Sequence, residues 1–428
     1  MAALLSLTVS LLVLAGILLA PWLIAVIAPG FEGEKREATT RLVRILFPGA
    51  GLLVLSAWCL GVLNSHRRFF LSYVAPVVWN LAIIAALVVY GGETRQYDLA
   101  MIAAWGSVAG SLLQFAVQLP TVLRLLGGLR AGPLLDPPVR AVIGNFLPVF
   151  LGRGVVQVSA YVDTVLASLL PTGAVAAVSY AQVLYTLPVS LFGMSVSAAE
   201  LPEMASATGT DAERAGFLRG RLEAGLRQIA FLVVPSVVGF VALGDVVTGA
   251  LYQSGEFTRD MTEYVWVILA AASVGLLPST LGRLYSSAFY ALHDTRTPLR
   301  IALIRVSLGV ALGYGLALHL PPALELDARW GAAGITLASG LAAAIEYRLL
   351  RRALSARIGV TTLEWATLAR LWASALTAAG CGWLVRYALP PLHPIPAAAL
   401  VLGAFGAVYL AGAAMLGVPQ ARRLLRLR

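Results

Sequence analysis

The chain has 428 residues, of which 59% are hydrophobic and 12% are charged, and its mean hydropathy is +0.84. Because soluble domains carry about 25% charged residues, this composition excludes a soluble globular protein and indicates an integral membrane protein. The formal net charge of +10 comes from 30 Arg and 1 Lys, and these cations flank apolar runs, so membrane topology and anionic lipids explain them better than nucleic acid does.

Apolar segments recur along the whole chain, each close to the length of about 20 residues that a helix needs to cross a bilayer. We expect an all-α membrane protein with about twelve spans, at 3–28, 43–64, 71–91, 99–124, 141–169, 173–201, 228–252, 264–290, 299–320, 329–350, 366–388 and 395–418. The first segment has no basic region before it and no cleavage site after it, which predicts a true span and not a signal peptide.

Several of these spans contain proline, including Pro48, Pro188 and Pro235. A proline removes a backbone donor and kinks its helix, so a neighbour must satisfy the freed carbonyl. Outside the spans, the dense Gly and Pro residues of 127–140 do not continue a helix. We therefore expect an N-terminal lobe at 1–126 with about four spans, a linker at 127–140 and a C-terminal lobe at 141–428 with about eight spans.

The distribution of Arg and Lys between alternate connections predicts the orientation. One set of connections carries most of the cations, and the positive-inside rule places this set and both termini in the cytoplasm. The connection 29–44 is the one discordant element, because it carries Lys35, Arg36, Arg41 and Arg44 on the opposite side.

Arg153 and Gln157 are the first candidate substrate contacts. Arg153 lies about a dozen residues past Arg140, roughly 20 Å along a helix, which predicts a position near mid-membrane. Gln157 follows one turn later on the same face. The pair can donate to a phosphate, because an arginine fork matches phosphate oxygens. The alternative is a structural bond to the carbonyls of a kinked neighbour.

Asp163 lies roughly 15 Å beyond Arg153 along the same helix, too far for a direct ion pair. Ionisable residues inside a span usually face a bundle interior or a wet cavity. Asp163 is therefore expected to bind a coupling cation, to pair with another helix, or to lie near the outer surface beside the 171–173 turn, and the last is favoured.

Other polar residues in the spans have structural explanations. Glu200 and Glu203 are expected to form an ion network at a helix end with the nearby arginines, because no nucleophile or metal ligand accompanies them. Arg305 is expected to snorkel from the cytoplasmic end of its span. Gln114 and Gln118 are expected to hold kinked helices by hydrogen bonds of about 1 kcal/mol each.

Short motifs follow one another in a fixed order along most of the chain. They are Ala20-Pro21-Trp22, Ala28-Pro29-Gly30-Phe31, Leu63-Asn64-Ser65-His66-Arg67-Arg68-Phe69, Ala75-Pro76 with Asn80, Asp163-Thr164, Leu187-Pro188, Gly255-Glu256-Phe257-Thr258, and Phe289-Tyr290-Ala291 with Asp294-Thr295-Arg296-Thr297-Pro298. As a set they resemble the MurJ (MviN) family of lipid II flippases, in the multidrug/oligosaccharidyl-lipid/polysaccharide exporter superfamily. The resemblance implies two helical lobes around a V-shaped central cavity and transport by alternating access.

The resemblance also marks two departures. Family members usually have fourteen spans, and this chain is expected to lack the first two, which carry a cluster of cavity arginines. On the sixth span here, Tyr180-Ala181 is followed by Gln182-Val183, where many members carry an acidic-Arg pair. This departure removes the usual cation from that span, and Arg153 is expected to replace it. Arg283 matches a position that is often basic in the family, which implies a role at the cavity mouth in attracting an anionic headgroup, with snorkelling as the alternative. Gln157 and Gln182 are expected to meet polar head groups in the cavity.

We therefore expect a multi-pass protein of the bacterial cytoplasmic membrane that flips lipid II from the inner to the outer leaflet. Expected partners are the undecaprenyl-pyrophosphate-linked peptidoglycan precursor, membrane lipids and a coupling cation, with no nucleic acid. We expect no enzymatic activity, no cofactor and no metal site. Two alternatives stay open: export of another lipid-linked oligosaccharide or a drug on the same fold, and a non-transporting scaffold in cell-wall assembly.

Overall fold

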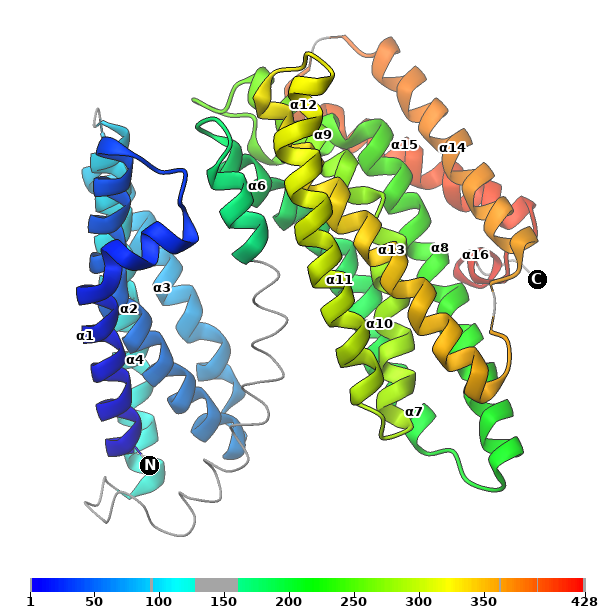
Figure 1. The fold of residues 1–428 in the computed structure, drawn as a ribbon, viewed down its shortest axis with the longest axis horizontal. Coiled ribbons are helices and arrows are strands. Elements are labelled where there is room, and N and C mark those ends of the chain that lie inside the picture. The colour runs from blue at the N-terminus through cyan, green and yellow to red at the C-terminus, as the bar shows by residue number, and fades with distance from the viewer. Residues whose placement is uncertain (1, 93–94, 128–160, 362, 391, 426–428) are drawn as a thin grey trace. The chain divides into compact units, whose positions relative to one another are not determined.

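The computed structural model describes residues 2–92, 95–127, 161–361, 363–390 and 392–425. These residues form helices joined by short connections, and none of them is in a strand. The all-α prediction is thus confirmed. The chain divides into unit 1, Met1–Val155, and unit 2, Val156–Arg428, and Figure 1 shows the helices of each. From residue 128 onward the expected linker 127–140 lies outside the described residues, so the lobe boundaries stay a prediction.

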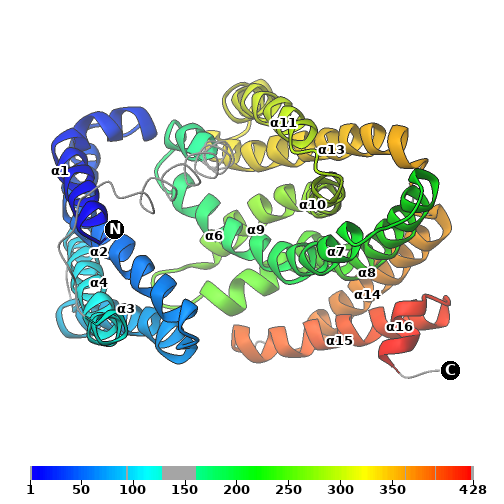
Figure 2. The ribbon, with the colours of Figure 1, turned by 90° about the horizontal axis from the view of Figure 1, so that it is seen from below.

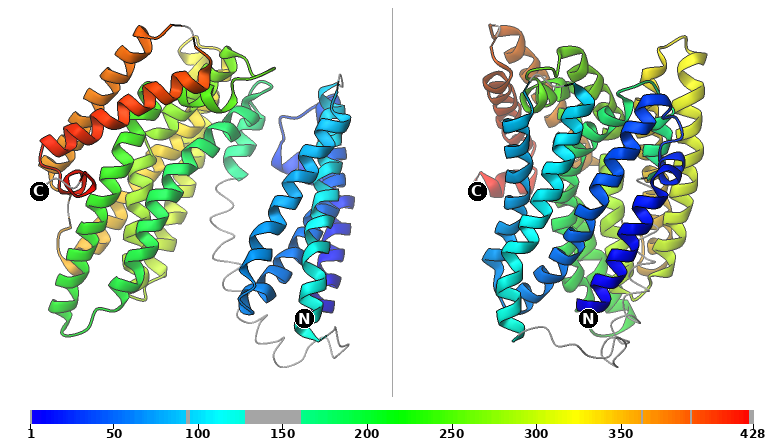
Figure 3. Two further views of the ribbon diagram at one scale, coloured as in Figure 1. Left: turned by 180° about the vertical axis from the view of Figure 1, so that it is seen from behind. Right: turned by 90° about the vertical axis from the view of Figure 1, so that its left-hand side faces the viewer.

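Unit 1 contains four long helices that run side by side in Figure 3 (right): α1 (Ala2–Ile27), α2 (Gly33–Ser65), α3 (Phe69–Tyr90) and α4 (Gln96–Leu126). A buried polar bridge joins α2 to α4. Ser56 Oγ donates to Gln118 Oε1 at 3.1 Å, and Gln114 Nε2 donates to Ser56 Oγ at 2.9 Å. The prediction that these two glutamines hold helices together is confirmed.

Unit 2 contains the remaining elements. They are α6 (Ala174–Pro188), η1 (Val189–Met194), α7 (Ser195–Ala205), α8 (Asp211–Tyr252), α9 (Arg259–Ser273), α10 (Leu276–Ala291), α11 (Arg296–Tyr314), η2 (Gly315–His319), α12 (Leu320–Ala323), η3 (Ala328–Trp330), α13 (Gly331–Ile358), α14 (Trp365–Ala388), α15 (Pro394–Met415) and α16 (Pro419–Leu424). In Figure 2, α11 lies beside α13 and α14 beside α15. The core of unit 2 gathers on α8, where Leu222, Leu226, Ile229 and Val233 recur at helical spacing and are fully buried.

Ten helices among the described residues are long and apolar enough to cross a membrane, or up to eleven when the bent pair α9 and α10 counts as one span. They match the expected spans except 141–169, most of which lies outside the described residues. Two helices begin earlier than expected, α2 at Gly33 and α8 at Asp211. The start of α8 is fixed by a capping box in which Thr210 N donates to Glu213 Oε2 at 2.8 Å.

The bend between α9 and α10 lies at a close approach of two backbones. The two helices meet at 44° around Gly275. A Cβ added to Gly275 would lie 2.3 Å from the Cα of Gly340 in α13. Only glycine therefore permits α13 to pass this close to the bend.

Carbonyls freed by proline find side-chain donors. Pro21 cannot bond the Ile17 carbonyl, and Arg44 Nε of α2 donates to it at 3.3 Å. Pro235 likewise leaves the Phe231 carbonyl free, and the Tyr409 hydroxyl of α15 donates to it. In both helices a neighbour supplies the donor that proline lacks, as the sequence analysis predicted.

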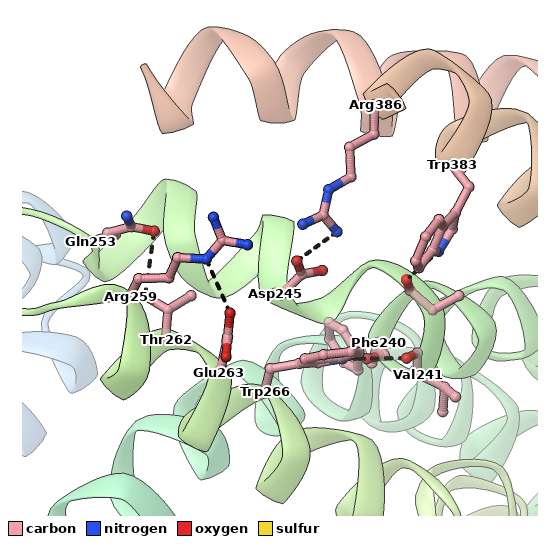
Figure 4. A network of polar contacts seen from close by, with 11 residues as sticks. Phe240, Val241, Asp245, Gln253, Arg259, Thr262, Glu263, Trp266, Trp383 and Arg386 are labelled. Atoms are coloured by element: carbon pink, nitrogen blue, oxygen red, sulfur yellow. Dashed lines mark hydrogen bonds and ion pairs between the residues drawn. The ribbon is translucent and has the colours of Figure 1, made fainter. Parts of the chain in front are cut away.

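Helix α8 also bends at Leu243, whose φ of −131° and ψ of 15° are not helical. Two indoles satisfy the carbonyls that this bend leaves exposed (Figure 4). Trp266 of α9 donates to the Phe240 carbonyl at 3.1 Å, and Trp383 of α14 donates to the Ala242 carbonyl at 2.9 Å. The bend is thus held by side chains from two other helices.

An ion pair lies directly after this bend. Asp245 of α8 and Arg386 of α14 are 2.6 Å apart, and the Asp245 side chain is 12% exposed. The Arg386 guanidinium also lies 5.7 Å from the centre of the Trp383 ring. Figure 4 shows this pair beside the indole contacts, so one cluster fixes α14 to α8.

Candidate functional site

Two of the predicted contact residues, Arg153 and Gln157, lie outside the described residues. Their roles in phosphate binding therefore stay predictions. The other three, Asp163, Gln182 and Arg283, all lie in unit 2 and in segments predicted to span the membrane.

Asp163 contacts another helix. Its helical segment, 161–168, is described, and Ser339 Oγ of α13 donates to both carboxylate oxygens at 3.3 Å. Arg305 of α11 lies within electrostatic range of the same carboxylate. Of the three expectations for Asp163, pairing with another helix is the one that these contacts support.

Arg305 has an acidic partner that the sequence analysis missed. Its Nη1 lies 3.2 Å from Oε2 of Glu346 on α13, and the two side chains are 37% and 14% exposed. Arg305 follows the first residue of α11 by nine residues, roughly 14 Å along a helix. The snorkelling expectation did not include this ion pair, in which a mostly buried carboxylate of α13 holds the Arg305 guanidinium.

Arg283 of α10 lies one helical turn after Ser279, whose hydroxyl bonds a tyrosine of α6. Ser279, one turn earlier, shares a 2.8 Å hydrogen bond with the Tyr185 hydroxyl of α6. Arg283 itself is exposed, and no ion pair of its guanidinium is recorded in the described part of the chain. It lies eight residues before the end of α10, roughly 12 Å along the helix.

Gln182 lies one helical turn before Tyr185 on α6. It is exposed, lies three residues before Tyr185 and so shares a helix face with it. Its Nε2 donates to Thr186 Oγ1 at 3.3 Å. We call Gln182, Tyr185, Ser279 and Arg283 the Tyr185 cluster. The structure therefore brings two of the predicted residues within one helical turn of a common contact.

The Tyr185 cluster offers hydrogen-bond donors inside a membrane segment. The Ser279 hydroxyl donates to the Leu276 carbonyl and bonds the Tyr185 hydroxyl, so these two groups are engaged within the protein. The Arg283 guanidinium and the Gln182 amide can replace the water around an anionic or sugar-like group, whereas leaving such a group unpaired in hydrocarbon costs several kcal/mol. The described residues contain no group of three His, Cys, Asp or Glu side chains that could hold a metal ion. The arrangement is one for binding.

The acidic pair on α7 is structural, as expected. Arg221 of α8 lies 2.9 Å from Glu200 and 3.6 Å from Glu203. The predicted ion network at this helix end is thereby confirmed.

Another ion pair of unit 2 involves Asp294. Asp294, in the turn between α10 and α11, accepts the backbone N–H groups of Arg296 and Thr297 at 3.0 Å each. It also accepts the Thr297 hydroxyl at 2.7 Å and pairs with Arg357 of α13 at 2.6 Å. The Thr297 backbone N–H, followed by its hydroxyl and by Arg357, holds the pKa of Asp294 well below its usual range.

Comparison with known proteins gives a family match over almost the whole chain. The model of the family described as "Lipid II flippase MurJ" matches residues 1–390. This match gives no support to the expectation that the chain lacks the first two spans of the family.

Two curated relatives illustrate the similarity. A "Probable lipid II flippase MurJ" of Rhizobium meliloti (strain 1021) is 32% identical over 335 residues, which are 76% of this chain and 59% of the relative. The "Lipid II flippase MurJ" of Burkholderia cenocepacia is 30% identical over 359 residues, which are 82% of this chain and 66% of the relative. The chain thus spans about three-fifths of the length of the curated relatives that it matches.

Solved structures share the fold. A structure titled "Lipid II flippase MurJ, inward closed conformation" matches with a TM-score of 0.78 and 21% identity, covering 99% of this chain and 84% of the other. The inward-facing structure of a multidrug resistance MATE family transporter of the MOP superfamily matches with a TM-score of 0.65 and 18% identity, covering 83% and 80%. At these identities the matches speak for the fold alone.

Proposed function

This chain belongs to the MurJ family of lipid II flippases, and we propose that it moves the undecaprenyl-pyrophosphate-linked peptidoglycan precursor from the inner to the outer leaflet of the bacterial cytoplasmic membrane. A diphosphate-sugar-peptide head cannot cross hydrocarbon unaided, because burying unpaired charge costs many kcal/mol. The protein supplies replacement contacts while the polyprenyl tail stays in the lipid. Alternating access of the two lobes then exposes the head to one side and to the other.

The observation that carries this proposal is the Tyr185 cluster. Arg283 is an exposed guanidinium deep in a span, with no ion pair recorded in the described ranges. Gln182 presents an amide one turn from the same contact. In this proposal Arg283 binds phosphate and Gln182 meets the polar head, while Arg153 and Gln157 add further donors.

Asp163 is proposed to hold a coupling cation. Among the residues that the structure describes, Ser339 is the recorded hydrogen-bond donor to its carboxylate oxygens, and the nearby Arg305 is engaged by Glu346. An inside-negative membrane potential would also help the outward movement of the anionic head, by about 2.3 kcal/mol per charge per 100 mV. The excess of cations in alternate connections supports cytoplasmic termini at both ends.

The test is complementation of a strain depleted of its own flippase, with lipid II in the outer leaflet measured in whole cells. We expect the parent chain and Arg300→Gln to restore both growth and outward lipid II, and Arg283→Gln to lose at least tenfold in outward lipid II. Arg300 is the matched control, because it is an exposed cation only four residues after Arg296, at the start of α11.

Three results would count against the proposal. If Arg283→Gln transports as well as Arg300→Gln, the Tyr185 cluster is not part of the transport path. Restored growth without lipid II in the outer leaflet would favour the non-transporting scaffold, and no restoration of either would favour a different lipid-linked substrate.

A further inference from the structure

Three of the four discordant cations of 29–44 line a pocket in unit 1. This pocket lies between α1 and the first turns of α2 and has a volume of about 480 Å³. Its lining includes Pro21 of α1 and Arg36, Glu37, Thr40, Arg41 and Arg44 of α2. Three guanidiniums facing one carboxylate give the pocket an excess of positive charge.

The three arginines differ in how they are held. Arg44 is fixed by its bond to the Ile17 carbonyl, which Pro21 leaves free. Arg36 and Arg41 are exposed, and no hydrogen bond or ion pair of either guanidinium is recorded in the described part of unit 1. Their donors are therefore available to a ligand. Lys35, next to Arg36, lies instead 3.9 Å from the centre of the Phe31 ring and does not line the pocket.

An apolar groove lies between the same two helices, one helical turn from this pocket along each of them. It has a volume of about 410 Å³, and its lining includes Val13, Leu14 and Ile17 of α1 and Pro48, Leu52 and Leu55 of α2. Ile17 joins the two spaces, because it lines the groove while its carbonyl accepts the Arg44 bond of the pocket. In Figure 1 the first turns of α2 lie across α1 before α2 descends beside it.

We propose that this α1–α2 seam binds a lipid that carries a phosphate group. The phosphate lies among Arg36, Arg41 and Arg44, whose planar forks match phosphate oxygens. A hydrocarbon chain of the same lipid fills the groove, since Ile17 and Pro48 of the groove lie one helical turn from Pro21 and Arg44 of the pocket. The cationic pocket lies at the end of the predicted span and the apolar groove lies along it. A bilayer places lipid phosphates and lipid hydrocarbon in the same two positions.

Such a site explains why these cations stand against the positive-inside count. Cations that bind a lipid phosphate have a role in binding, so they need not follow the distribution that sets membrane orientation. Glu37 opposes the phosphate and lies four residues before Arg41, a favourable spacing for a helix pair. Glu37 therefore limits the affinity and offers a substitution that should increase it.

The experiment is a native mass spectrometry titration of the full chain in a neutral detergent. The ligands are dihexanoyl phosphatidic acid, dihexanoylglycerol, which lacks the phosphate, and inorganic phosphate, which lacks the chains. We expect phosphatidic acid to bind at least tenfold more tightly than either fragment, which corresponds to about 1.4 kcal/mol. Equal affinity for inorganic phosphate would overturn the lipid assignment, and equal affinity for dihexanoylglycerol would overturn the phosphate assignment.

Variants locate the binding. The double substitution Arg36→Gln with Arg41→Gln should weaken phosphatidic acid binding at least tenfold, whereas the control Lys35→Gln should change it less than twofold. Glu37→Gln should tighten it, which is a readout that no loss of folding can imitate. Equal binding by the double variant and by Lys35→Gln, or no gain in Glu37→Gln, would refute the site. Because binding is measured at equilibrium, this result is independent of whether the chain transports lipid II.

Discussion

Removing the Asp294 carboxylate tests how the turn between α10 and α11 is stabilised. Asp294→Ala deletes the acceptor of two backbone N–H groups, a loss comparable to that of an N-cap, about 0.5–2 kcal/mol. It also deletes the ion pair with Arg357, whose side chains are 17% and 45% exposed, and such a pair contributes only about 0.2–1 kcal/mol. We expect a total cost of about 2 kcal/mol. Arg357→Gln removes the ion pair alone and should cost less than about 1 kcal/mol.

The dependence on pH follows from the lowered pKa of Asp294. Because the folded-state pKa lies below the unfolded value near 3.9, this stabilisation is complete above that value. It is lost as the pH falls through the folded pKa. The difference in free energy of unfolding between the parent and Asp294→Asn should therefore be constant from about pH 5 to 8 and should shrink below about pH 4.

The assay is unfolding of the purified chain by sodium dodecyl sulfate titration, followed by circular dichroism. The reasoning is wrong if Asp294→Ala costs no more than Arg357→Gln, because the backbone contacts would then contribute nothing. It is also wrong if the difference between the parent and Asp294→Asn is unchanged at pH 3.

Three further substitutions probe the packing of unit 2. Trp383→Phe leaves one α8 carbonyl unpaired and should lower the free energy of unfolding by about 1–2 kcal/mol, with faster hydrogen exchange confined to the α8 bend. Arg386→Gln leaves the mostly buried Asp245 carboxylate without its ion-pair partner, so it should lower the thermal midpoint of unfolding further than Trp383→Phe does. An equal or smaller shift would contradict this reasoning. Gly275→Ala forces a methyl group into the α13 backbone and should reduce the yield of folded protein, whereas Gly403→Ala, with open space around it, should be neutral or stabilising by up to about 1 kcal/mol.

The spans were predictable because a helix that crosses the hydrocarbon needs a long run of apolar residues, which hydropathy measures directly. The first residues of the helices were harder to predict. At α2 the helix begins at Gly33, ten residues before the expected 43, because a charged helix can project beyond the hydrocarbon. At α8 the early start had a signal, since Thr210 and Glu213 have the spacing of a capping box. A hydropathy window averages over such pairs and cannot detect them.

Sequence reasoning named candidate residues for the site but did not identify the partners of the polar residues in the spans. Gln182 and Arg283 could be identified because a polar side chain inside a membrane span is energetically costly and usually faces a bundle interior or a wet cavity. Glu346 carried the same signal, an acid inside the expected span 329–350, yet it lies 41 residues from Arg305. Ser339 is 176 residues from Asp163. Such pairs depend on how the helices pack against one another, and the residue pattern of a single helix carries no information about that packing.

The bend in α8 has a mechanical consequence. Its nearest helix-internal proline, Pro235, lies eight residues before Leu243, so the angle is not imposed by the ring of a proline. The angle is set from outside, by indoles that belong to α9 and α14. Straightening α8 would return those carbonyls to hydrogen bonds inside the helix and leave the two indole N–H groups without acceptors in hydrocarbon. The three helices are therefore expected to move as one rigid body during any rearrangement of this unit.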